Sequence, residues 1–201
     1  VIDVERKNEL AGNIHGKGMM IAQACLSNIL DLPSQLPFSA SLVFEQSYGE
    51  IDGDSASLAI FCVLSSALAD LPLPQHIAIT GSIDQFGLVH SVGGVNDKIE
   101  GFFTICQRRG LTGKQGVIIP MTTIQQLSLS DEVKSAVKNG EFFIYPVEDI
   151  YQACELLFGR DLLDENKDYT EKTEPLSRLI QRRIEGRADS ERKSFWHFFR
   201  S

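Results

Sequence analysis

Residues 49–57 read GEIDGDSAS, and the apolar run LAIFCVLSSALA continues the chain to residue 69. The segment before this stretch alternates apolar and polar residues, which predicts a strand. The glycines and aspartates that follow predict a turn, and the apolar run predicts a buried helix beginning at Ser55. Pro72 and Pro74 lie just beyond the predicted end of that helix, where proline is common. A strand–turn–helix unit of this kind predicts a layered α/β domain.

The same alternation of strand and helix patterns continues on both sides of this stretch. Periodicity alone does not assign Met19–Leu30, because a short apolar run fits either type of element. The chain is therefore expected to form mixed α/β layers. The predicted strands cover 38–48, 76–83, 86–92, 116–120 and 142–145, and the predicted helices cover 55–69, 95–109, 149–158 and 175–187.

Composition narrows the class of protein. A chain of 201 residues with 43% hydrophobic residues has enough apolar material for one sizeable core, which excludes a disordered protein. The net charge of −8 argues against a partner bound by phosphate neutralisation, so we expect no nucleic acid ligand. No apolar run reaches about 18 residues and no signal segment opens the chain, so we expect a cytoplasmic protein without a membrane span.

Charge density divides the sequence near residue 160. Residues 1–160 carry 18 acidic and 10 basic side chains, whereas residues 161–201 carry nine of each, so that 18 of those 41 positions are charged. We interpret 1–160 as the domain and 161–201 as a charged extension with one helix at 175–187. The aromatic cluster at 195–199 fits either a surface docked on a partner subunit or a loose end of the chain.

The four cysteines are Cys25, Cys62, Cys106 and Cys154. They are far apart in the sequence and no pair has the spacing of metal ligands, so no metal site is expected. Each lies among apolar residues, which is typical of a reduced thiol in a hydrophobic core.

Ser55 is the first candidate for chemistry. A serine presented at the start of a helix lies beside unpaired backbone N–H groups, which can stabilise an oxyanion. The alternative is structural, since the side chain of Ser55 or Asp54 could simply cap the helix.

A hydroxyl nucleophile needs a base, and the sequence offers histidine or lysine. No histidine stands in a pattern that indicates a Ser–His–Asp triad, although such triads are defined in space. Lys98 follows Gly93-Gly94 and lies in the first turn of a predicted helix, where the helix dipole and apolar neighbours disfavour the charged amine. The segment GNIHGKG at 12–18 lacks the spacing of a phosphate-binding loop, so no nucleotide site is expected.

Three motifs in order resemble the proteolytic domain of Lon proteases: GDSAS at 53–57, ITGS at 79–82 and VGGVNDKIEG at 92–101. The subtype is the one found in archaeal Lon and in a group of bacterial Lon-like proteins, and the resemblance covers about residues 10–160. It implies the mixed α/β fold of that family, which is of the ribosomal protein S5 domain 2-like type. It also implies that Met19–Leu30 is a strand leading into a helix.

By this resemblance Ser55 and Lys98 form a Ser–Lys dyad and Thr80 helps to hold the lysine. Asp54 is a supporting residue, because its carboxylate would keep Lys98 charged if it pointed inward. The sequence departs from the family pattern at Ser82, where glutamate is frequent, and at Thr123, where asparagine is usual.

The resemblance implies a serine endopeptidase that cleaves unfolded or delivered protein and peptide substrates within a homo-hexameric ring. Complete Lon proteins carry an upstream ATPase module, so we expect this chain to be an excised piece with no cofactor, ATP and Mg²⁺ belonging to the ATPase part. Two alternatives stay open: a catalytically silent Lon-fold ring or interaction module, and a Ser–His hydrolase that uses His15 or His90.

Overall fold

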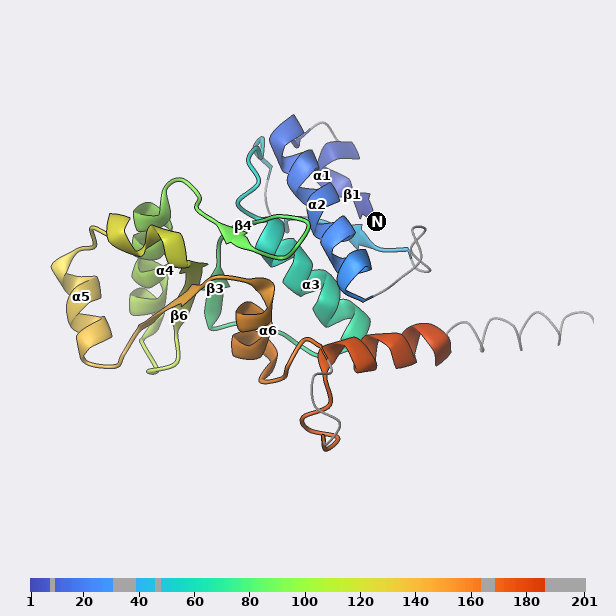
Figure 1. Cartoon of the computed structure of the whole chain (residues 1–201). Coiled ribbons are helices and arrows are strands. Elements are labelled where there is room, and N and C mark those ends of the chain that lie inside the picture. Colours follow the sequence, from blue (N-terminus) through green and yellow to red (C-terminus); the bar gives the residue numbers. More distant parts are fainter. Residues whose placement is uncertain (8–9, 31–38, 46–47, 164–168, 187–201) are drawn as a thin grey trace, which may run out of the picture.

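The computed structural model describes residues 1–7, 10–30, 39–45, 48–163 and 169–186 (Figure 1). The aromatic cluster at 195–199 lies outside these residues. The helices are α1 (Val4–Lys7), α2 (Asn13–Ile29), α3 (Ser57–Ala69), α4 (Val95–Arg109), the 3-10 helix η1 (Met121–Gln126), α5 (Asp131–Lys138), α6 (Ile150–Phe158) and residues 176–186. The strands are β1 (Ile2–Asp3), β2 (Ser41–Leu42), β3 (Ile77–Ile79), β4 (Ser82–Ile83), β5 (Val89–His90), β6 (Gly116–Pro120) and β7 (Phe143–Val147).

The largest sheet is parallel, with strand order β3-β6-β7. Its central strand β6 is buried along its whole length, which explains why residues 116–120 read as a continuous apolar run rather than an alternating one. The chain connects β3 to β6 through the β4–β5 hairpin and α4, and β6 to β7 through η1 and α5. The two remaining sheets are the pairs β1–β2 and β4–β5.

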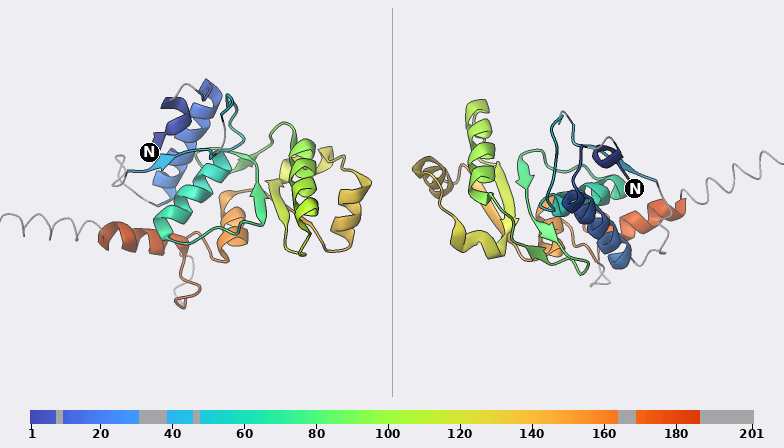
Figure 2. Two further views of the ribbon diagram at one scale, coloured as in Figure 1. Left: turned by 180° about the vertical axis from the view of Figure 1, so that it is seen from behind. Right: turned by 90° about the horizontal axis from the view of Figure 1, so that it is seen from above.

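Strand β6 separates two hydrophobic clusters. Ile118 packs with α2, α3, α6 and residues 176–186, whereas Val117 and Ile119 pack with α4 and α5. Successive side chains of a strand point to opposite faces, so one strand can serve both clusters. Figures 1 and 2 show the same division, with α4 and α5 at one end of the molecule and α2 and α3 side by side at the other.

The mixed α/β fold predicted from the sequence is confirmed. Helix α4 and strand β6 coincide with the predicted ranges 95–109 and 116–120. The predicted helix 149–158 begins one residue later, because the Asp149 side chain accepts the Gln152 N–H at 2.9 Å and therefore acts as the N-cap of α6. Residues 176–186 form the expected helix, and Arg187 lies outside the described residues.

The implied strand at the start of Met19–Leu30 is wrong, since α2 is helical from Asn13 to Ile29. The helix begins at Asn13 because the carboxylate of Asp52 accepts the backbone N–H groups of Ile14 and His15, each at 3.1 Å. The first turn of a helix leaves such N–H groups without a partner inside the helix. The capping residue Asp52 is 37 positions from His15 in the sequence, so the local sequence around residue 13 does not indicate the start of the helix.

Three predicted strand ranges contain shorter strands than expected, whereas the predicted strand 142–145 corresponds to the longer β7 (Phe143–Val147). The range 38–48 contains only β2 (with 38 and 46–47 outside the described residues), and the range 86–92 contains only β5. The range 76–83 divides into β3 and β4 because its backbone partners change: Thr80 N–H donates to Ile118, but Gly81 N–H donates to the Ser55 carbonyl. The segment therefore leaves the sheet where it meets the turn that contains Ser55.

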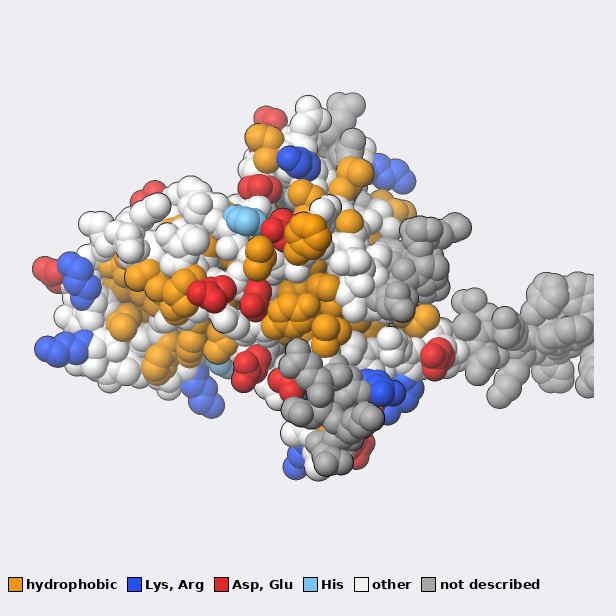
Figure 3. Space-filling model, in the orientation of Figure 1, with side chains coloured by type: hydrophobic (Ala, Val, Ile, Leu, Met, Phe, Trp, Pro, Cys, Tyr) orange, Lys and Arg blue, Asp and Glu red, His pale blue; other side chains and the backbone are white. Residues whose placement is uncertain are grey.

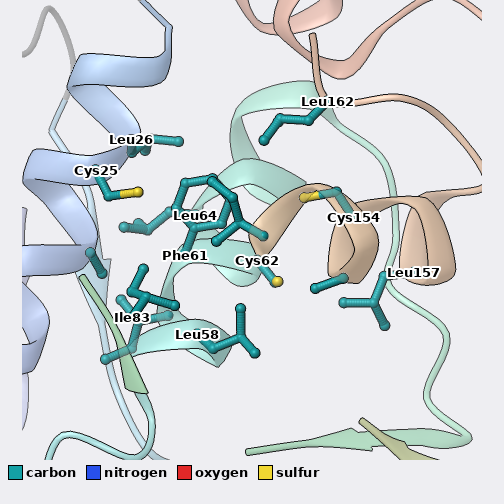
Figure 4. Packing of buried hydrophobic residues seen from close by; sticks show 14 of the residues in the cluster. Cys25, Leu26, Leu58, Phe61, Cys62, Leu64, Ile83, Cys154, Leu157 and Leu162 are labelled. Atoms are coloured by element: carbon teal, nitrogen blue, oxygen red, sulfur yellow. The ribbon is translucent and has the colours of Figure 1, made fainter. Parts of the chain in front are cut away.

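All four cysteines are free and buried, which confirms their predicted role as core residues. Cys25, Cys62 and Cys154 come from α2, α3 and α6 and lie in the cluster between these helices (Figure 4). Burial raises the pKa of the Cys25 thiol to about 12, and contact with Cys62 together with burial raises that of Cys154. A thiol with a raised pKa is a poor nucleophile at neutral pH.

The described part of 161–201 packs onto the rest of the molecule. Leu162, Leu176 and Ile180 are at most 1% exposed and belong to the cluster around α3. Arg183 forms an ion pair at 2.9 Å with Asp70, the C-cap residue that directly follows α3. Within the described residues no helix has the length and apolar character needed to cross a membrane.

Candidate active site

Ser55 lies in a turn two residues before α3, not at the first residue of the helix as predicted. The N-cap residue is Ala56, and it provides no side-chain cap. Instead, the Asp54 backbone carbonyl accepts the Ser57 N–H at 2.9 Å. The interpretation of the Ser55 or Asp54 side chain as the helix cap is therefore wrong, and among the described residues the Ser55 hydroxyl makes no capping contact.

The turn is held by the segment that follows β3. The Ser55 carbonyl accepts the N–H of Gly81 at 3.0 Å, and Leu58 N–H donates to the Gly81 carbonyl at 3.2 Å. A Cβ atom at Gly81 would lie 3.0 Å from side-chain atoms of both Leu58 and Val89. A side chain at residue 81 would therefore crowd Leu58 and Val89. Because glycine has no side chain, the two backbones can approach closely enough to hold Ser55 in place.

Lys98 reaches this turn from the first turn of α4. Its Nζ donates to the Thr80 hydroxyl at 3.2 Å, and that hydroxyl donates to the Ser55 carbonyl at 3.4 Å. Residue 98 as a whole is exposed, yet partial burial lowers the pKa of its amine below the ordinary 10.5. A lowered pKa increases the fraction of neutral amine, which is the form that can accept a proton.

The structure thus brings together Ser55, Thr80 and Lys98 from three separate segments of the chain. The Ser55 and Lys98 side chains are not hydrogen bonded to each other; within the described residues their connection runs through Thr80. The N–H groups of Ser57 and Leu58 are already used, whereas those of Ser55 and Ala56 donate to no acceptor in the described part of the chain. These last two are the donors that remain for an oxyanion beside Ser55.

Asp54 is oriented by a residue that sequence reasoning did not assign to the site. Its Oδ2 accepts the hydroxyl of Ser82 at 2.8 Å. Close to it, the Ser57 hydroxyl accepts the Ile83 N–H at 2.9 Å. The two contacts join the turn before α3 and the first residue of α3 to β4. The spacing of Thr80 and Ser82, two residues apart, is the signal that could have indicated a shared face.

The two candidate histidines, His15 and His90, have other partners. His15 is buried, with its Nε2 atom 3.4 Å from Asp3 and its ring edge-on to Phe44, and His90 contacts Asp84 at 2.9 Å. Burial acts to raise the pKa of Asp84, but hydrogen bonds from His90 and two backbone N–H groups outweigh it and lower the pKa. Neither histidine is hydrogen bonded to Ser55 among the described residues, so the contacts do not favour a Ser–His pair.

Ser82 and Thr123, the two residues that depart from the family pattern, both make hydrogen bonds within the fold. Ser82 holds Asp54, as described above, and Thr123 is fully buried with its hydroxyl donating to the Pro120 carbonyl at 2.7 Å. Thr123 therefore fastens η1 to the end of β6 and lies outside the set of residues around Ser55.

Residues 49–159 match the family model of the Lon protease (S16) C-terminal proteolytic domain. The chain therefore belongs to the Lon protease family, and the matched region contains Ser55, Thr80, Lys98 and Asp54.

Known relatives agree with this assignment. The whole chain is 98% identical to a third (33%) of the "Putative Lon protease homolog" of Haemophilus influenzae. It is 62% identical over 78% of its length to the protein of that name in Escherichia coli, covering 27% of it. It is 38% identical over 59% of its length to the "Archaeal Lon protease" of Methanocaldococcus jannaschii, and the match covers 16% of that protein. The chain thus spans a third or less of these relatives.

Proposed function

We propose that this chain is a serine endopeptidase domain in which Ser55 is the nucleophile and Lys98 is its base. The observation that carries the proposal is the chain of contacts from Lys98 Nζ through the Thr80 hydroxyl to the backbone carbonyl of Ser55, inside the region that matches the Lon proteolytic domain. A neutral amine has two hydrogens and one lone pair, so it can donate to Thr80 and still accept a proton from Ser55.

In the proposed reaction, Lys98 Nζ takes the proton of Ser55 Oγ as that oxygen attacks a peptide carbonyl carbon. The N–H groups of Ser55 and Ala56 are the candidates to hold the resulting oxyanion. When the peptide C–N bond breaks, Lys98 gives the proton that it took from Ser55 to the leaving amine. A water then attacks the acyl-enzyme and loses a proton to Lys98. Lys98 passes that proton to Ser55 Oγ as the ester C–O bond breaks and the carboxylic acid product leaves.

The proposed substrates are unfolded or delivered polypeptides. Phe86 and Leu88, between β4 and β5, are 67% and 51% exposed, on the hairpin whose first residue holds Asp54. Hydrophobic side chains are also exposed near acidic ones on the face shown in Figure 3. Exposed apolar surface of this kind supports contacts with chains that have not buried their own apolar residues.

The ATP dependence of the whole protein is a separate proposal. We expect ATP and Mg²⁺ to act on an ATPase part of a longer parent chain and expect the assembly to be a homo-hexameric ring. The 201-residue chain itself is then expected to cleave unfolded casein slowly without nucleotide and to leave stably folded proteins intact. Stimulation of folded-protein degradation by ATP and Mg²⁺ would contradict this division of labour.

The test compares Ser55→Ala, Lys98→Ala and Lys98→Arg with the parent chain in casein hydrolysis and in labelling by a serine-directed phosphonate. All three variants are expected to lose hydrolysis by about 1000-fold or more while keeping the parent circular dichroism spectrum, because nucleophile and base act as a unit. Arginine does not deprotonate in this pH range and cannot replace the lysine. Lys114→Arg, at an exposed lysine, is the matched control.

The same assays, extended to His15→Ala and His90→Ala, separate the alternatives. A chain that neither labels at Ser55 nor cleaves casein is the silent ring or interaction module. Retention of activity by Lys98→Arg, with loss in His15→Ala or His90→Ala, would instead identify a Ser–His hydrolase.

A further inference from the structure

Two hydroxyl groups on one short segment contact the turn that carries Ser55. Thr80 binds the Lys98 amine and the Ser55 carbonyl, and Ser82 binds the Asp54 carboxylate. Side chains two residues apart on an extended chain share a face and are separated by about 6–7 Å. The segment therefore holds a basic amine and an acidic carboxylate at two neighbouring but separate positions.

We propose that Ser82 is a positioning residue, whose hydroxyl holds the Asp54 carboxylate on β4 and thereby keeps this negative charge from pairing with the Lys98 amine. The proposal deepens the proposed function and rests on it for its catalytic consequence. Ser82 touches neither Ser55 nor Lys98 through a hydrogen bond among the described residues; it acts through Asp54.

The position of Asp54 makes the separation necessary. Asp54 directly precedes Ser55, whose carbonyl is one hydrogen bond from Thr80 and two from Lys98 Nζ. Within the described residues Asp54 forms no ion pair with Lys98, and burial alone accounts for the lowered pKa of the amine. A carboxylate released to within about 4 Å of the amine would favour its charged form.

Packing against α2 also restricts Asp54. A Cβ atom at Gly18 of α2 would lie 3.1 Å from the Asp54 Cα and 3.2 Å from its Cβ. The helix therefore passes directly against residue 54. Removing the Ser82 hydroxyl leaves the carboxylate without the one side-chain donor that holds it among the described residues.

Other charged groups lie on the same segments as this site. Asp97 adjoins Lys98 on α4, and neighbouring positions on a helix do not face each other. Lys17 is an exposed residue of α2. The remaining groups are Glu100 of α4, bound to Ser130; Asp52, bound to Ile14 and His15; Asp84, bound to His90; and His15, beside Asp3.

The experiment measures the pKa of Lys98 directly, so that it does not depend on activity. The 201-residue chain is labelled with ε-¹³C lysine and titrated by NMR, and the Lys98 signal is assigned by its loss in Lys98→Arg. In Ser82→Ala we expect the Lys98 pKa to rise by about one unit or more, because Asp54 is free to approach the amine. Ser82→Thr keeps the hydroxyl and is expected to keep the parent pKa.

Two further variants distinguish charge from mere loosening of the turn. Ser82→Ala combined with Asp54→Asn has no carboxylate to release, so the pKa should return to the parent value. Ser57→Ala removes the hydroxyl contact between the first residue of α3 and β4 but leaves Asp54 held, so it should not raise the pKa of Lys98. Circular dichroism confirms that each variant is folded.

The outcomes separate this proposal from the proposed function. An unchanged Lys98 pKa in folded Ser82→Ala, or an equal rise in the variant that also carries Asp54→Asn, would overturn the role of Ser82. In a hydrolytically active chain, the acid limb of the pH–rate profile should move to higher pH together with the measured pKa. A rise of the pKa in a chain without any hydrolysis would support the Ser82 contact and refute the endopeptidase.

Discussion

At the scale of single residues, Thr80 is the group on which the candidate site depends. Its hydroxyl accepts a hydrogen bond from Lys98 Nζ at 3.2 Å and donates one to the Ser55 carbonyl at 3.4 Å. Thr80 is buried, with 7% of the residue exposed. A hydroxyl in this place can orient the lysine and the turn at the same time.

Thr80→Val should keep the shape of the side chain and remove both hydrogen bonds. We expect kcat to fall by at least about tenfold with a smaller change in KM, since a displacement of about 1 Å at a catalytic group costs about 100-fold. Steady-state hydrolysis of a fluorogenic peptide measures this. Thr80→Ser should restore most of the rate, and Thr104→Val, which removes a hydroxyl bonded within α4, is the control. A parent rate in Thr80→Val would remove Thr80 from the site.

The lowered pKa of Lys98 predicts the direction of the pH dependence. Below that pKa the amine is protonated and cannot act as a base, so kcat/KM should rise with pH and level off above it. Because burial lowers the pKa from 10.5, the plateau should begin at lower pH than a solvated lysine allows. A profile from about pH 6 to pH 11 measures this. An acid limb centred at or above 10.5 would contradict the assignment of Lys98 as the base.

At the scale of elements, the turn before α3 also determines where α2 begins. Asp52 accepts two N–H groups of the first turn of α2, and hydrogen bonds from the Gly53, His15 and Ile14 N–H groups lower the pKa of its carboxyl. One short segment therefore supplies the helix cap and the candidate nucleophile. A change at the cap is expected to affect both.

Asp52→Ala should lower the thermal unfolding midpoint by about 2–4 °C, because the first turn of α2 loses its acceptor. Asp52→Asn keeps an acceptor oxygen and should lose less, and Glu50→Ala, at an exposed neighbour, should change little. The effect should appear above the unfolded carboxyl pKa and fade as the pH falls through the lowered native pKa, where the native carboxylate is protonated. Thermal melts at neutral and acidic pH test this, and an equal loss at both would show that the charge of the cap is unimportant.

At the scale of the whole molecule, the described residues beyond 160 are part of the main hydrophobic cluster. Leu176 and Ile180 are fully buried there, and the backbone N–H groups of Leu176 and Ser177 donate to Asp161 and Leu162. The boundary near residue 160 therefore marks a change in charge density, and the helix that follows it adds apolar contacts to α3 and α6.

Ile180→Ala should destabilise the whole molecule by about 2–5 kcal/mol, the usual cost of truncating a fully buried aliphatic side chain. Glu185→Ala, at an exposed position of the same helix, should stay within about 0.5 kcal/mol. Urea unfolding followed by circular dichroism measures both. If Ile180→Ala unfolded at the parent urea concentration, the helix would not contribute to the stability of the core.

The sequence by itself determined the features that depend on neighbouring residues. Helix α4 and strand β6 were predicted with their observed bounds, because Gly93-Gly94 breaks the chain before the helix and a short apolar run suits a buried parallel strand. The buried cysteines followed from their apolar surroundings. The motifs around Ser55 and Lys98 indicated the family.

Only the tertiary structure decided how these residues meet. The start of α2 depends on Asp52, the end of β3 on the Ser55 carbonyl, and the direction of Asp54 on Ser82. In each case the hydrogen-bond partner lies 25 to 38 positions away in the sequence. Periodicity reports the local preference of the backbone, whereas a bond between distant residues forms only after packing has brought their segments together.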